Sequence, residues 1–204
     1  PRVAADAVRV VYFVPGGSSV FAGPPAAPRR YDFAGIVTGA AWGGVDVEDL
    51  VYVMTTDADG SGSLARITLE AGTIQTLREH LDAPNRFNAI GVSPEGRYLY
   101  LALASGAPPD DAARHRPGAD RDTDIYRFDL RDDRLRPFIV APGDDFYPAV
   151  VGDHLYWTHN DLRDQVAVVP AAGGDARVVV EDAEIPYWSH DGARIAFTHG
   201  GWRI

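Results

Sequence analysis

Short apolar runs separated by tight polar turns follow one another along the chain. In a clear example, the apolar positions 90–92 are followed by Ser93-Pro-Glu-Gly96 and then by an almost unbroken apolar run at 98–102. The glycine of such a turn supplies the positive φ that a close hairpin needs. An unbroken apolar run is typical of a strand covered on both faces. The pattern therefore predicts strand–turn–strand units, with no helix beyond a single turn at 77–81.

This unit recurs five times. The centres of its second strands are expected at Tyr12, Tyr52, Tyr100, Tyr156 and Ala196, which are 40, 48, 56 and 40 residues apart. In three units a third strand follows, predicted at 64–69, 124–130 and 165–169. After a short turn comes an outer strand, predicted at 73–77, 135–140 and 176–180. A period of roughly 40–45 residues with four strands per unit is typical of propeller blades.

We therefore predict an all-β fold, a β-propeller of four-stranded antiparallel blades in one domain, 1–204. About four complete blades and part of a fifth are expected, in an incomplete or fragmentary ring. The blades are expected at about 1–35, 36–80, 87–140 and 145–181, with a partial blade at 184–204. Closure as a small ring, or completion of the last sheet by a partner, are the alternatives to a fragment.

Two phrases of the repeat resemble a known family. Pro-x-Trp-Ser-x-Asp-Gly-x-x-Ile-Ala-Phe (186–197) and Asp124-Ile-Tyr126 are similar to the WD-like repeat of TolB-type β-propellers. The resemblance implies the fold and a role for Trp188, Asp191 and Gly192 in holding a blade together. It implies no chemistry, because this repeat serves binding scaffolds, peptidase propeller domains and some lyases alike.

Composition narrows the function classes. The chain has 29 acidic and 19 basic residues, a net charge of −10, so we expect no nucleic-acid partner. All basic residues are arginine and there is no cysteine, which removes lysine and thiol chemistry. No apolar run approaches the roughly 18 residues of a membrane span. No signal peptide is visible, and the lack of cysteine favours a periplasmic or extracellular location, with association with a membrane complex left open.

Blade topology places the second-to-third strand loops and the blade-to-blade connections at the same end of the ring. Loops on a rigid framework are common binding sites, so we predict a charged partner-binding face there. Its expected residues are Asp110, Asp111, Arg114, Arg116, Asp144, Asp145, Asp161, Arg163, Glu181 and Asp182. The alternative is a solvated rim that keeps the protein soluble.

Two places could hold a metal. Asp57, Asp59 and Ser61 resemble the start of a calcium loop, but the twelfth position is Thr68 where that loop requires glutamate. His159 and His199 occupy equivalent positions of two blades and could share a divalent metal with an aspartate. We expect a plain hairpin loop at residues 57–61 and ordinary hydrogen bonding of the two histidines, and therefore no cofactor. The alternative is calcium or another divalent metal at these places.

No catalytic residues are predicted, because the chain has no Gly-x-Ser-x-Gly, His-Glu-x-x-His or phosphate-loop motif. The preferred function is a non-catalytic scaffold for protein–protein interaction, as an accessory subunit of a cell-envelope or larger complex. One alternative is the propeller domain of a prolyl-oligopeptidase-like or tricorn-like serine peptidase whose catalytic domain lies outside this chain. The other is a metal-dependent lyase or a sugar-binding propeller that uses His159 and His199.

Overall fold

The structure is a computed structural model that describes residues 10–43, 49–83, 90–104, 122–160, 164–188 and 194–199. These residues form seventeen strands in five antiparallel sheets and contain no helix. Accordingly, no helix within the described ranges is long and apolar enough to cross a membrane. The sheets follow one another along the chain, and we number them as blades 1 to 5.

The strands of each blade pair in chain order. Blade 1 comprises β1 (Val10–Phe13), β2 (Ser19–Gly23) and β3 (Arg29–Asp32). Blade 2 comprises β4 (Ile36–Trp42), β5 (Leu50–Thr56), β6 (Ser61–Thr68) and β7 (Thr73–Asp82). Blade 3 comprises β8 (Ile90–Val92), β9 (Tyr98–Ala104), β10 (Thr123–Asp129) and β11 (Arg134–Ile139). Blade 4 comprises β12 (Asp144–Val151), β13 (His154–Asn160), β14 (Asp164–Pro170) and β15 (Arg177–Glu181). Blade 5 comprises β16 (Ala183–Trp188) and β17 (Ile195–His199).

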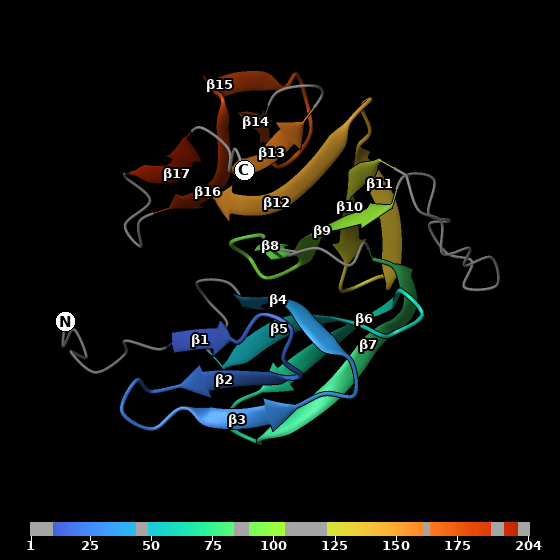
Figure 1. Cartoon of the computed structure of the whole chain (residues 1–204), viewed down its shortest axis with the longest axis vertical. Coiled ribbons are helices and arrows are strands. Elements are labelled where there is room, and N and C mark those ends of the chain that lie inside the picture. The colour runs from blue at the N-terminus through green and yellow to red at the C-terminus, as the bar shows by residue number, and fades with distance from the viewer. Residues whose placement is uncertain are drawn as a thin grey trace.

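The blades fan out around a common axis, in chain order from blade 1 to blade 5 (Figure 1). The first strands of blades 2 to 5 lie innermost: β8 contacts both β4 and β12, and β12 also contacts β16. This radial arrangement is a β-propeller, which confirms the predicted fold class. The predicted first strand of blade 1, at residues 1–6, lies outside the described residues.

The repeat is preserved in the pairing register. Tyr52, Tyr100 and Tyr156 lie on the second strands of their blades, as predicted. Each lies opposite a small residue of the inner strand, namely Ala41, Gly91 and Ala149. A Cβ added to Gly91 would meet the Val150 side chain and the Pro148 carbonyl of blade 4, each at 3.3 Å. Small residues at this register therefore allow the inner strands of neighbouring blades to approach closely.

The core consists of apolar layers between adjacent blades. Leu99, Leu101 and Leu103 of β9 belong to the layer shared with blade 2. Tyr100 and Ala102, the alternating residues of the same strand, belong to the layer shared with blade 4. All five are buried because β9 has a neighbouring blade on each face. This explains why the sequence of a second strand shows no polar alternation.

A hydrogen bond also joins blades 3 and 4. The Tyr100 hydroxyl donates to the carbonyl of Ala171 over 3.0 Å, and the Tyr100 ring packs edge-on against Phe138, with their centroids 5.2 Å apart. Ala171 follows β14 directly, so the bond links the second strand of blade 3 to the turn before β15.

The predicted helical turn at 77–81 is wrong. These residues continue β7, which pairs with β6 as far as Asp82 opposite Ser61. The pairing shifts between Gly62 and Ala65, and His80 has a positive φ of 57°. A β-bulge accommodates such an irregularity without ending the strand, so the polar run Arg78-Glu79-His80 stays in the sheet.

We predict that Leu101→Ala destabilises the fold by about 2–5 kcal/mol, because the truncation leaves a cavity in the layer between blades 2 and 3. Val14→Ala is the control: Val14 is 61% exposed, and its truncation should change the free energy of unfolding by less than about 0.5 kcal/mol. Urea unfolding of the two variants measures the difference. Equal losses of stability would contradict the packing described here.

Candidate functional site

The start of β10 and the connection into blade 4 meet at one end of the propeller. The backbone N–H and the hydroxyl of Thr123, at the start of β10, both donate to Asp144 Oδ1, over 3.0 and 2.7 Å. Gly143 N–H donates to Asp122 Oδ2 over 3.4 Å. Asp122 and the start of β10 therefore lie beside the connection into blade 4. We call this end of the molecule the loop end.

The predicted partner-binding face is only partly described. Asp144 is half-buried and bonded to Thr123, whereas Glu181 and Asp182 are exposed at the loop end. Asp145 is fully buried, so its inclusion in an exposed face was wrong. Consecutive strand residues point to opposite faces, and the Asp145 side chain turns into the space between blades 3 and 4. The other predicted residues lie outside the described residues: Asp110, Asp111, Arg114, Arg116, Asp161 and Arg163.

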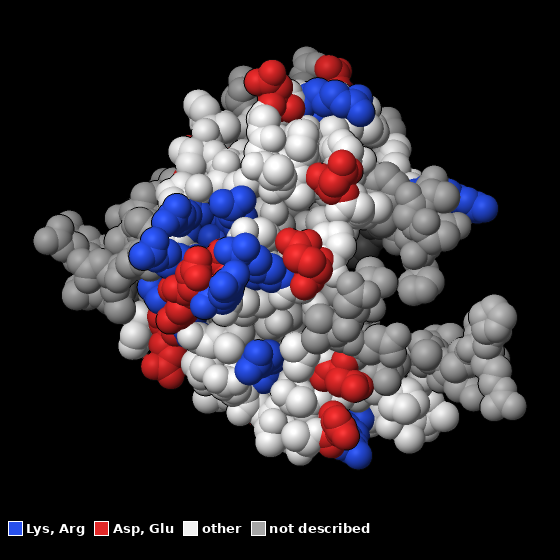
Figure 2. Space-filling model, turned by 180° about the vertical axis from the view of Figure 1, so that it is seen from behind, with Lys and Arg blue, Asp and Glu red and all other residues white. Residues whose placement is uncertain are grey.

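The opposite end of the molecule carries mixed charges. The guanidinium of Arg97 lies 2.7 Å from Asp129 and 3.7 Å from Asp132, and Arg78 lies 3.8 Å from Asp133. The hydrogen bond from Arg97 lowers the pKa of Asp129 below its usual range. Figure 2 shows such arginine and acidic side chains interleaved on the back of the molecule. The charges of this arginine–aspartate group largely compensate one another.

The residues of the candidate calcium loop form a compact hairpin. Asp59 Oδ1 accepts hydrogen bonds from the backbone N–H and the hydroxyl of Ser61, over 2.9 and 2.7 Å. Asp57 N–H donates to the Ser61 carbonyl over 2.7 Å, and Gly60 supplies a positive φ of 84°. The loop thus satisfies Asp59 Oδ1 internally. Among the described residues, no three His, Asp or Glu side chains are grouped closely enough to hold a metal.

The predicted histidine pair is only half described. His159 lies on β13, and its Nδ1 is 2.8 Å from Asp145 Oδ1. His199 ends β17, where its backbone pairs with Ala183, but its side chain lies outside the described part of the structure. A metal shared by the two histidines remains a prediction.

Sequence reasoning missed the most distinctive buried polar cluster, formed by Asp145, Trp157 and His159. Asp145 Oδ1 accepts the indole N–H of Trp157 over 2.8 Å and also contacts His159 Nδ1. Asp145 lies directly opposite His159 in the β12–β13 pair, and Trp157 precedes His159 by two residues on the same face. The available signal was an aromatic residue and a histidine alternating on one strand, with an acidic residue at the matching register of the strand before it.

Burial controls the chemistry of this cluster. Desolvation raises the pKa of Asp145 to about 6, while the hydrogen bonds from His159 and Trp157 oppose the rise and the nearby Asp124 adds to it. Asp145 Oδ2 is buried and has no hydrogen-bond partner among the described residues. A buried acceptor without a partner costs about 1–3 kcal/mol. The cluster therefore holds an acceptor that the described part of the protein does not satisfy.

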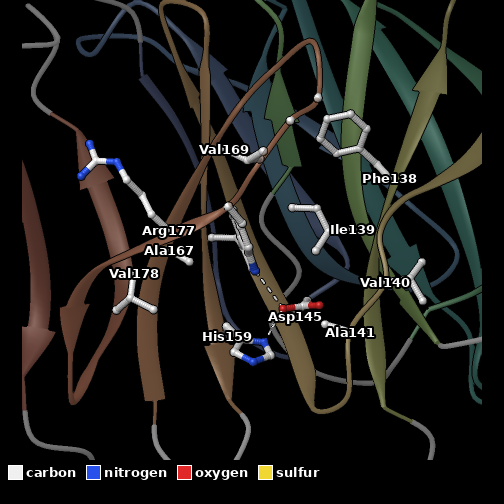
Figure 3. Close-up of a pocket in the computed structure, with 14 residues that line it drawn as sticks. Phe138, Ile139, Val140, Ala141, Asp145, His159, Ala167, Val169, Arg177 and Val178 are labelled. Atoms are coloured by element: carbon white, nitrogen blue, oxygen red, sulfur yellow. Dashed lines mark hydrogen bonds and ion pairs between the residues drawn. The ribbon is translucent and has the colours of Figure 1, made fainter.

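The cluster lies at one end of a groove between blades 3 and 4 with a volume of about 390 Å³ (Figure 3). One wall comes from the end of β11 and the residues after it, namely Phe138, Ile139, Val140 and Ala141. The other wall comes from β13 to β15 and the turn between β14 and β15, including Ala167, Val169, Gly173, Gly174, Ala176, Arg177 and Val178. Most of the lining is apolar. The carboxylate of Asp145 and the imidazole of His159 form a polar pair at one end of it.

Comparison with known proteins identifies the fold. No family model and no curated protein matches the chain. A chain in the crystal structure of a nidogen/laminin complex is 15% identical with a TM-score of 0.64, over 94% of this chain and 69% of that one. A structure assigned to TolB from Agrobacterium tumefaciens is 16% identical with a TM-score of 0.64, over 90% of this chain and 67% of that one. The tricorn protease is 10% identical with a TM-score of 0.54, over 87% of this chain and 21% of that one.

These likenesses define the class of protein: the chain is a β-propeller. The solved structures that share this fold include one assigned to TolB. At identities of 10–16% the likeness shows the fold alone.

We predict that Asp145→Asn changes the pH dependence of stability. Between about pH 4 and pH 6 the folded protein holds a proton on Asp145 that the unfolded chain has released, so wild-type stability falls as pH rises through this window. Asparagine keeps an acceptor for Trp157 and His159 but cannot ionise. Relative to the variant, the wild type should therefore lose about 3 kcal/mol between pH 4 and neutral pH.

Urea unfolding of both proteins across this range measures the effect. Parallel stability profiles for wild type and Asp145→Asn would show that the carboxylate is not desolvated as described.

We predict that neither calcium nor a chelator at about millimolar concentration shifts the melting temperature, because Asp59 Oδ1 is satisfied by Ser61. Asp59→Ala should lower the melting temperature equally with and without calcium, through loss of the turn. A calcium-dependent rise in the wild type that Asp59→Ala abolishes would instead establish a calcium site in this hairpin.

Proposed function

We propose that this propeller is a non-catalytic scaffold whose loop end binds a basic surface of a protein partner. The observation that carries the proposal is that two adjacent carboxylates are exposed at the loop end. Glu181 and Asp182 make no ion pair with any described residue. At the other end, Asp129, Asp132 and Asp133 are paired with Arg97 and Arg78.

Uncompensated carboxylates attract a basic partner from a distance. Their field adds to that of the whole chain, whose net charge is −10. The electrostatic field extends over roughly 8 Å at physiological ionic strength. It therefore raises the association rate of a basic partner and disfavours the binding of acidic proteins. Paired charges, in contrast, cancel over the same distance and contribute little beyond their own contact.

The framework also holds these groups in place. The connections into blades 4 and 5 are short, with Asp182 the single residue between β15 and β16. The connection into blade 4 is tied to the residues at the start of β10 by the Thr123–Asp144 and Gly143–Asp122 hydrogen bonds. A surface ordered before binding loses less conformational entropy when the partner arrives.

Within this proposal, the protein acts as an accessory subunit of a periplasmic, extracellular or other cell-envelope complex. The same fold occurs in a chain of a nidogen/laminin complex, which is compatible with a role in assembly.

The test compares two matched double variants. Glu181→Gln/Asp182→Asn removes two charges at the loop end, and asparagine tolerates the positive φ of 52° at Asp182. Glu70→Gln/Asp175→Asn removes two exposed charges from third-to-fourth strand turns, at the opposite end. We predict that the loop-end variant lowers partner affinity about two- to tenfold, while the control leaves it unchanged.

Affinity capture from an extract of the source cells, at low and high salt, supplies the partner, and titration of the purified pair supplies the affinities. Capture should weaken as salt screens the charges. Equal affinities for the two variants, or capture that salt does not weaken, would refute a loop-end electrostatic interface.

A further inference from the structure

The groove between blades 3 and 4 is separate from the exposed carboxylates of the loop end, and its chemistry is different. It pairs an apolar lining with one buried acid, Asp145, whose Oδ1 is saturated by Trp157 and His159. Its Oδ2 has no partner among the described residues, although the side chain is 0% exposed. A native protein rarely leaves a buried acceptor unsatisfied without a structural or functional reason.

Figure 3 shows how the carboxylate is oriented. One oxygen faces Trp157 and His159, and the other points across the groove toward the wall formed by Val140 and Ala141. The unsatisfied oxygen is thus directed into the space between the two blades. Arg177 also lines the groove, but its guanidinium points away from Asp145 in this view.

We propose that this groove binds a small organic cation, a primary ammonium or guanidinium carried on an apolar body. The cationic head donates a hydrogen bond to Asp145 Oδ2, and the body packs between β11 and the outer strands of blade 4. This function is additional to the proposed partner binding and does not depend on it.

The head group must be a donor because an ionised carboxylate only accepts hydrogen bonds. A cationic donor is favoured over a neutral one because charge-assisted hydrogen bonds are about twice as strong. The titratable groups that face the carboxylate are His159 at 2.8 Å and Asp124, which raises the pKa of Asp145. A ligand cation would offset both the repulsion from Asp124 and the desolvation of Asp145 itself.

The body must be apolar and small. Phe138, Ile139 and Val140 face Ala167, Val169 and Val178 across the groove. A volume of about 390 Å³ lies at the lower end of the range of small-molecule sites, roughly 300–1,000 Å³. Burial of hydrocarbon between these walls supplies affinity, while the single acid at one end fixes the orientation.

Access to Oδ2 requires a small local movement. Asp145 is covered from solvent, but Val140 is 67% exposed and lies in the connection between β11 and β12. Displacement of Val140 and Ala141, which precede the hydrogen-bonded Gly143, would expose the carboxylate without breaking a strand pair. Binding should therefore perturb Val140 and Ala141 together with the Trp157 indole.

The experiment titrates the full chain with three matched probes at about pH 7.5, above the pKa of Asp145. The probes are 2-phenylethylamine, its neutral analogue 2-phenylethanol and the anion 3-phenylpropanoate. The readout is the indole N–H signal of Trp157 in nitrogen-15 NMR spectra, assigned with Trp157→Phe. We expect saturable binding of the amine, at least roughly tenfold weaker binding of the alcohol, and no binding of the anion.

Two variants locate the site. Asp145→Asn should weaken amine binding at least tenfold, whereas the matched Asp57→Asn, on an exposed loop of blade 2, should not change it. Ala176→Phe fills the groove from an exposed position and should abolish binding in a folded chain, which keeps the test valid if Asp145→Asn unfolds. Absence of amine binding, equal binding of the alcohol, or unchanged binding by Ala176→Phe would overturn the proposal.

Discussion

The whole structure depends on sheets that bury both of their faces. A four-stranded sheet with apolar side chains on each side is stable only when another layer covers each of them. In blade 3 the leucines of β9 require blade 2, and Tyr100 and Ala102 require blade 4. Each blade is therefore part of its neighbour's core, and the order of blades along the chain follows directly from this mutual covering.

The same constraint explains why a polar cluster between blades is unusual. The layers between blades are apolar over most of their area, so a carboxylate placed there loses its hydration. Trp157 and His159 satisfy one oxygen of Asp145 and leave the other directed into the groove. The energetic cost of this arrangement is consistent with a binding role, since sites commonly retain polar groups that a well-packed core would exclude.

The fold was readable from the sequence because its signals are local. The turn phrase fixes where two strands meet, and its recurrence fixes the number of sheets, so the positions of Tyr52, Tyr100 and Tyr156 could be predicted together. The prediction for 77–81 was wrong because the polar residues there suggested the end of the strand, whereas the strand continues through a β-bulge. The strand positions and the number of sheets could both be inferred without knowledge of contacts between distant residues.

The site was less predictable because it depends on which face of a strand meets the next blade. Asp144 and Asp145 are adjacent and chemically identical, yet one caps the loop end and the other is buried. Composition cannot separate them, since a shift of one residue in register exchanges their environments. Only the pairing of Asp145 with His159 and the depth of Trp157 distinguish the two.

The Tyr100–Ala171 hydrogen bond has a mechanical consequence. It joins the second strand of blade 3 to the turn before the outer strand of blade 4. The two sheets are therefore connected at this turn as well as through their inner strands, β8 and β12. Separating the two blades as rigid bodies would break this hydrogen bond. A hinge motion between blades 3 and 4 is therefore opposed at two places. Local displacement of Val140 and Ala141, which precede blade 4, is easier than such a motion.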